Sequence, residues 1–305
     1  MANINIFGSL KARFKNADVL MQFIYINIGV FIIINGIFLI FKLFDIEGKN
    51  LTDYLNLPAS FILFIKKPWT IIIYSFLHYD FWHILGNMLL LYWFGRKFLS
   101  IFSGRQLGGL YVIGGIVGGL LYMSAFNVFS HFAGFDRLDE YSLVGASASV
   151  LAVMVAPAIA FPDYSFRFFF FRNVRLKHIT IIAVILIVFR DLAALDSEHN
   201  LGVLAHLGGG LTGVCFALAH TKGVDITSPV NKGIDKLINL FKPGTGAKIS
   251  HETRSEQTQR ETDWEYNIRK KREEDELNRI LDKLKASGYE CLSADEKRSL
   301  FNAGK

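Results

Sequence analysis

Long apolar segments alternate with short polar connections over the first 221 residues of the chain. A bilayer core about 30 Å thick needs roughly 20 apolar residues in helical form. Six segments approach that length: 20–44, 81–102, 107–129, 144–161, 179–195 and 201–221. The first is too long for a signal-peptide core and has no small-x-small cleavage site, so we expect it to be retained. The pattern predicts an all-α polytopic membrane protein with six transmembrane helices.

Charge is concentrated after these segments. Residues 222–305 hold 17 of the 33 Lys and Arg and 15 of the 27 Asp and Glu, although 51% of the whole chain is hydrophobic. The composition is too apolar for an ordinary soluble protein and indicates a membrane part followed by a water-soluble tail. The net charge of +6 lies in short clusters beside apolar segments. We therefore expect membrane lipids, and no nucleic acid, as the partner of these clusters.

Basic residues mark one side of the predicted topology. They occur before the first span, after the second and after the fourth: Lys11, Arg13, Lys15, Arg96, Lys97, Arg105, Arg167, Arg172, Arg175 and Lys177. The connections after the third and fifth spans carry more acidic than basic residues, and Asp191 is one of the acids in the latter. Because Lys and Arg favour the cytoplasmic side, we expect both termini in the cytoplasm. The connection 45–69 carries three lysines against this pattern, and its apolar stretch predicts a place in the outer interface.

The charged tail is predicted to contain helices of its own. We divide the chain into a cytoplasmic segment (1–19), the membrane domain (20–221), an interfacial amphipathic helix with a flexible linker (222–262) and a small cytoplasmic helical module (263–305). A helix is expected to start at Ser228, and a long charged helix is expected over 264–286. Ser293 with Glu296 forms a capping box that opens the last helix. A hairpin of about 40 residues seldom folds alone. We therefore expect it either to dock on an unidentified partner, a second copy or the membrane part, or to be a weakly ordered tail.

Polar side chains at membrane depth are costly and are candidates for a functional site. His83 and Asn87 lie one helical turn apart in the second span, Ser147 opens the fourth span, and His206 lies in the sixth. All four are toward the outer ends of their spans in the topology above. We therefore expect them to meet at one depth, in a cavity that water can enter.

The chemistry of these four residues is complementary. Ser147 is a nucleophile if a base takes its proton, and His206 has a pKa suited to that task. The Asn87 amide, an N–H of His83 and the backbone N–H of Ser147 are donors for the oxyanion that develops. A zinc site using His78, His83 and His206 lacks a carboxylate or thiolate ligand. We therefore expect no metal and no cofactor, and we assign His78 a packing or gating role.

Taken together, these residues match the sequence motifs of a known protein family. The sequence resembles the rhomboid intramembrane serine proteases over roughly residues 15–221, through His83 and Asn87, Gly145-Ala-Ser147-Ala148, and Ala205-His206 followed by Gly209 and Gly213. The resemblance implies a six-helix rhomboid-like bundle in a bacterial cell membrane that cleaves transmembrane segments of protein substrates. Ser147 would be the nucleophile, His206 its base, and His83 with Asn87 the oxyanion donors. The tail resembles a small module appended to some bacterial rhomboids.

Two positions depart from the family pattern. Alanine occupies position 148, where the family usually has glycine, and the arginine of the family's Trp-Arg pair is replaced by Thr70 after Trp69. The extra β-carbon of Ala148 lies where backbone must approach the oxyanion. It is the basis of an alternative function, a catalytically inactive rhomboid-like protein that binds transmembrane helices. Ser149 is a rival nucleophile, but its spacing from Gly145 does not fit the motif.

Overall fold

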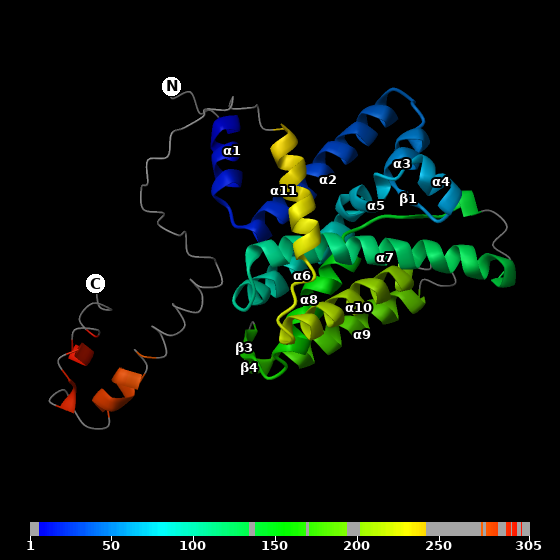
Figure 1. Cartoon of the computed structure of the whole chain (residues 1–305). Coiled ribbons are helices and arrows are strands. Elements are labelled where there is room, and N and C mark those ends of the chain that lie inside the picture. The colour runs from blue at the N-terminus through cyan, green and yellow to red at the C-terminus, as the bar shows by residue number, and fades with distance from the viewer. Residues whose placement is uncertain are drawn as a thin grey trace, which may run out of the picture. The chain divides into compact units, whose positions relative to one another are not determined.

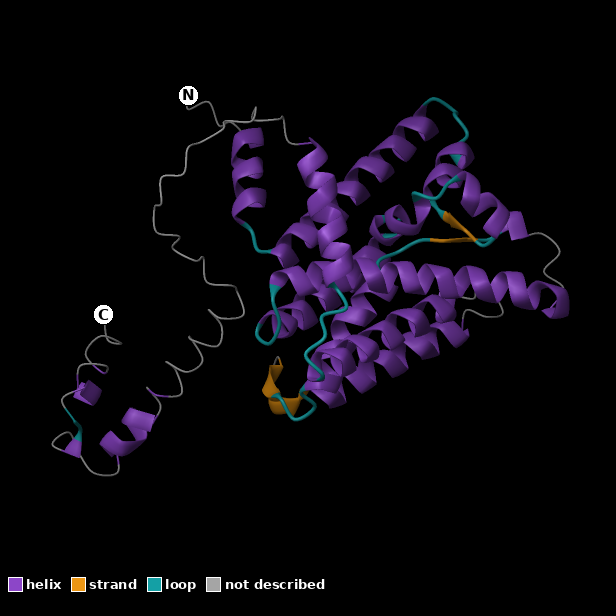
Figure 2. Cartoon of the chain, in the orientation of Figure 1, coloured by secondary structure: helices purple, strands orange, loops and turns teal. Residues whose placement is uncertain are grey.

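The computed structural model describes residues 6–133, 138–168, 171–193 and 202–241, and parts of the C-terminal segment between residues 276 and 300. The chain divides into two compact units, Met1–Pro243 and Gly244–Lys305. Helices make up most of the first unit, and its described strands form two short two-stranded sheets (Figure 2). The predicted all-α class is confirmed, whereas the two small sheets have no counterpart in the prediction.

Helices occupy all six of the predicted apolar segments. They are α2 (Val19–Leu43), α6 (Phe81–Leu99), α7 (Gly104–Ala133), α8 (Ser147–Ala160), α9 (Leu176–Ala193) and α10 (Gly202–Thr221), shown in Figure 1. Within the described ranges, α2, α7 and α10 are long and apolar enough to cross a membrane. The protein is therefore a membrane protein, and the number of six spans stays a prediction.

Helix α8 is the centre of the bundle. It contacts α6, α7, α9 and α10, and every residue from Ala148 to Ala158 is buried. Its 14 residues extend about 21 Å at 1.5 Å per residue, less than the bilayer core of about 30 Å. Helix α8 by itself is therefore too short to cross such a core.

Glycines let α7 and α10 approach α8 closely. A β-carbon built on Gly118 of α7 would lie 2.6 Å from the Ala148 β-carbon, and one on Gly213 of α10 would lie 2.7 Å from the Ala152 carbonyl oxygen. Both distances are too short for carbon to occupy. Gly114 with Gly118 in α7, and Gly209 with Gly213 in α10, have small-xxx-small spacing, and these pairs allow backbone-to-backbone packing around α8.

The connection between α2 and α6 contains short elements. They are α3 (Lys49–Leu55), β1 (Leu57–Pro58), α4 (Phe61–Lys66), α5 (Thr70–Ile73) and the 3-10 turn η1 (Tyr74–Phe76). On α4, Ile62 and Ile65 are exposed. Strand β1 pairs antiparallel with β2 (Ser142–Leu143), which follows a second 3-10 turn, η2 (Leu138–Glu140). This pairing ties the first connection to the chain just before Ser147.

The remaining elements of the first unit lie around the bundle. They are α1 (Ile6–Asn16), β3 (Ser165–Phe168), β4 (Phe171–Arg175) and α11 (Ser228–Phe241). The helix expected from Ser228 is confirmed by α11. It contacts α7, where Asp235 pairs with Arg105 and Asn231 Nδ2 donates a 3.1 Å hydrogen bond to the Arg105 carbonyl. Amphipathic α11 is thus attached to the first turn of α7.

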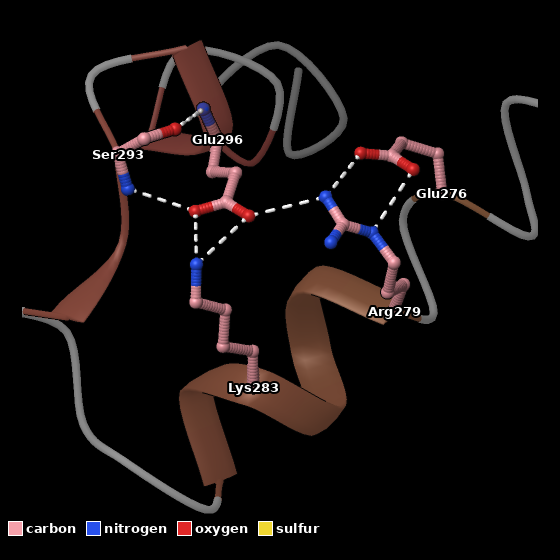
Figure 3. Close-up of polar contacts among 5 residues, drawn as sticks. All are labelled: Glu276, Arg279, Lys283, Ser293 and Glu296. Carbon is pink, nitrogen blue, oxygen red and sulfur yellow. Dashed lines mark hydrogen bonds and ion pairs between the residues drawn. The ribbon is translucent and has the colours of Figure 1, made fainter.

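The C-terminal unit is organised around the buried carboxylate of Glu296 (Figure 3). Its oxygens accept hydrogen bonds from Lys283 Nζ (2.9 and 3.1 Å), Arg279 Nη2 (3.1 Å) and Ser293 N (2.8 Å). The Glu296 N–H donates in return to Ser293 Oγ at 3.2 Å. The predicted capping box is therefore formed. Most of the charged helix expected over 264–286 lies outside the described residues.

We expect this unit to lose stability in acid. The Lys283 ammonium, and next the Ser293 N–H, lower the pKa of the Glu296 carboxyl from its usual 4.5 to about 2. Because the folded-state pKa is depressed, the stabilisation is complete above pH 4.5 and is lost as the pH falls toward 2. Hydrogen exchange of amides 279–285 in the whole chain, corrected for intrinsic rates, measures this loss.

Two variants make that measurement specific. Glu296→Gln is expected to show weak protection at every pH, because the amide cannot form the ion pair with Lys283. Asp282→Asn removes an exposed carboxylate from the same helix and is expected to keep the wild-type pH dependence. An unchanged pH dependence in Glu296→Gln would contradict the assignment.

Candidate active site

The segment that leads into α8 is held by a glycine. Gly145 has a φ of +118°, a conformation that side chains other than hydrogen rarely tolerate. Its N–H donates a 2.9 Å hydrogen bond to the carbonyl of Tyr74. A β-carbon at this position would lie 2.6 Å from the His83 ring. Glycine therefore brings this backbone directly beside the imidazole of His83 in α6.

Ser147 and His206 are in contact. Ser147 is the first residue of α8 and His206 lies in the second turn of α10. Ser147 Oγ is 2.5 Å from His206 Nε2. His206 is 7% exposed, whereas Ser147 is only partly buried. A hydroxyl bonded to an imidazole nitrogen is the arrangement in which a base activates a nucleophile.

Asn87 and His83 lie on the α6 side of the same region. Asp80 caps α6 and its Oδ1 accepts a 2.9 Å hydrogen bond from His83 N. The Asn87 amide, buried at 6% exposure, donates a 3.0 Å hydrogen bond from Nδ2 to His78 Nε2. An amide nitrogen carries two N–H donors, so the second one remains for another acceptor.

His78 has a more specific place than packing or gating. It is fully buried, and its Nε2 also accepts a 3.4 Å hydrogen bond from Ala146 N. Its ring centroid is 5.1 Å from that of His83. His78 therefore links Asn87 of α6 to the segment before Ser147, a contact that sequence reasoning missed.

Asp191 is a further polar residue at this place. Its Oδ2 contacts His206 Nδ1, on the side of the ring opposite Ser147. In the sequence, Asp191 is one of several acids that indicate an outward-facing connection. The only sequence signal for another role is position. Asp191 lies near the end of the fifth predicted span and His206 near the start of the sixth, so the two can be close in space.

Two family models match the chain. The model for the rhomboid domain matches residues 66–222, more than half of the sequence, and a family of unknown function, DUF6576, matches residues 260–302. The chain belongs to the rhomboid family. No curated protein matches it. The predicted resemblance is confirmed, and with it membership of a family of intramembrane proteases that act on transmembrane substrates.

The alanine that departs from the rhomboid pattern packs away from the candidate site. Ala148 is 1% exposed and belongs to an apolar cluster with Leu57, Tyr74, Met123 and Phe126. Its β-carbon faces Gly118 of α7. In this rhomboid the extra carbon is therefore accommodated by a glycine on the neighbouring helix.

The second serine of the rhomboid motif region faces elsewhere. Ser149 is fully buried, and its Oγ lies 2.8 Å from a β-carbon built on Gly115 of α7. Within the described residues this hydroxyl makes no hydrogen bond. The structure therefore brings His206 to Ser147 and leaves Ser149 against α7. In the same described part of the chain, no three His, Cys, Asp or Glu side chains are grouped as metal ligands.

Proposed function

We propose that this protein is an intramembrane serine endopeptidase that cleaves transmembrane segments of other membrane proteins. The observation that carries the proposal is the 2.5 Å contact between Ser147 Oγ and His206 Nε2. Membership of the rhomboid family supports it. Ala148 lends no geometric support to the inactive alternative, because its β-carbon faces Gly118.

The proposed reaction follows from the positions of these groups. His206 Nε2 takes the Ser147 proton as Oγ attacks the scissile carbonyl carbon, and the protonated ring then gives that proton to the leaving amide nitrogen. This first step leaves Ser147 acylated and His206 neutral. Water then attacks the acyl carbon as His206 Nε2 takes its proton, and the ring gives that proton to Ser147 Oγ as the carboxylic acid product leaves. The complete cycle returns Ser147 and His206 to their starting states.

The negative charge that develops on the carbonyl oxygen in the transition state must be stabilised by hydrogen-bond donors. We assign this role to the free N–H of Asn87, an N–H of His83 and the backbone N–H of Ser147. The last is one of the N–H groups at the start of α8 that have no partner within the helix. One side of the proposed oxyanion site is thus built from α6, and the other from the beginning of α8.

The predicted topology supports a reaction near the outer surface. With both termini in the cytoplasm of a bacterial cell, the first residue of α8 lies below the outer face. Partly exposed Ser147 is then accessible to the water that hydrolysis requires.

Labelling with a fluorophosphonate probe tests the proposal. The purified protein in detergent is expected to be labelled, and Ser147→Ala and His206→Ala are expected to abolish labelling. Ser149→Ala is the matched control and is expected to keep it, because that hydroxyl is buried against α7. Failure of the wild type to react, beside a serine protease that is labelled in the same detergent, would favour the inactive helix binder.

A further inference from the structure

Asp191 is a buried carboxylate near the C-terminal end of α9. Its side chain is 7% exposed. One oxygen, Oδ2, contacts His206 Nδ1, and the other, Oδ1, accepts a 3.1 Å hydrogen bond from Arg190 Nη2. A buried charge is tolerated when it is paired and hydrogen-bonded. Both oxygens of this carboxylate have such a partner.

The two nitrogens of the His206 ring have different neighbours. Nδ1 faces Asp191, and Nε2 faces the Ser147 hydroxyl at 2.5 Å. An ionised carboxylate only accepts hydrogen bonds, and a neutral imidazole carries one N–H. The proton therefore belongs on Nδ1, and the lone pair of Nε2 is directed at Ser147. That nitrogen is the one that must take the serine proton.

We propose that Asp191 is a positioning residue that holds His206 in this tautomer and orientation. The proposal rests on the proposed function of Ser147 and His206. When Nε2 takes the proton from Ser147, the ring becomes an imidazolium whose positive charge the Asp191 carboxylate stabilises. The Nδ1 proton stays on the ring, and Asp191 takes up no proton. The carboxylate thus acts as the third group does in a Ser-His-Asp triad.

The rate of fluorophosphonate labelling between pH 5 and pH 9 tests this role. We expect Asp191→Asn to react about 10- to 100-fold more slowly, because a misoriented base loses the geometry of proton transfer. Among the described residues, the charged or titratable groups around His206 are Asp191 of α9, which contacts its Nδ1, and His83 of α6, and Arg190 of α9 pairs with Asp191. Removing the negative charge destabilises the imidazolium, so the acidic limb of the profile is expected to shift to lower pH.

Controls separate positioning from a purely structural role. Asp163→Asn removes a carboxylate paired with Lys177 and Arg175 and is expected to keep the wild-type rate and profile. A merely structural Asp191 would lower the labelled amount in proportion to unfolding and leave the acidic midpoint unchanged. A rate for folded Asp191→Asn within about threefold of wild type, with the same midpoint, would overturn the proposal.

The tautomer of His206 in the wild type is independent of how any Asp191 variant folds. Nitrogen NMR of protein labelled in its histidines, with His206 identified by its loss in His206→Gln, is expected to show the proton of the neutral ring on Nδ1. A proton on Nε2 would overturn the role of Asp191. If wild type is not labelled by the probe, the proposed function fails, and the tautomer still reports on the contact with Asp191.

Discussion

Replacing Asn87 by alanine is expected to slow fluorophosphonate labelling by about 100- to 1000-fold, the typical cost of losing one oxyanion donor. The reason is the geometry of the amide, one of whose N–H groups is bound to His78 Nε2 at 3.0 Å. That bond fixes the orientation of the amide before a substrate arrives. In the proposed mechanism the second N–H is then available to donate to the negative charge on the substrate carbonyl oxygen. The second-order rate constant of labelling is the measurement.

A matched control distinguishes catalysis from the loss of a buried amide. Asn27 of α2 is also fully buried, and its Nδ2 is bonded to the Tyr111 hydroxyl at 3.1 Å. Asn27→Ala is expected to lower the unfolding temperature in detergent but to leave the labelling rate of the folded protein within about threefold of wild type. Equal rates for Asn87→Ala and Asn27→Ala would show that Asn87 is not an oxyanion donor.

The polar residues of the candidate site could be predicted because a membrane makes them conspicuous. His83, Asn87, Ser147 and His206 interrupt apolar segments, where unpaired polar groups are expensive. Asp191 did not stand out in the same way. Acidic residues near the end of a span are common in outward-facing connections, so its charge was read as a topology signal. Only the packing of α9 against α10 reveals that its carboxylate reaches His206.

Local backbone geometry explains where the predicted fold and the structure differ. The fourth span was expected over 144–161, yet α8 begins at Ser147. Gly145 has a φ of +118°, which a right-handed helix excludes, so the helix cannot extend back to residue 144. The pairing of β1 with β2 involves only two residues in each strand. Such short strands leave no periodic pattern in the sequence.

Replacing Gly209 by alanine is expected to impair both folding and labelling. A β-carbon at this position would lie 2.1 Å from the carbonyl oxygen of Ala148, and no rotamer change relieves a contact with backbone. Helices α8 and α10 must therefore separate by about 1 Å, with a cost of about 1–3 kcal/mol or more for such overpacking. Ala148 follows Ser147 directly, and His206 is on the moving helix. A displacement of about 1 Å between Ser147 and His206 is expected to slow labelling by about 100-fold.

The neighbouring glycine supplies the control for this prediction. A β-carbon on Gly210 has no described atom within 4 Å, so Gly210→Ala adds no contact and removes a flexible residue from the interior of α10. It is expected to raise stability by about 0.5–1 kcal/mol and to keep the labelling rate. Thermal unfolding in detergent and the labelling rate measure both variants. Similar behaviour of the two would mean that close approach of α10 to the start of α8 does not set the Ser147–His206 geometry. A selective loss in Gly209→Ala would show that backbone contact between the two helices positions the nucleophile against its base.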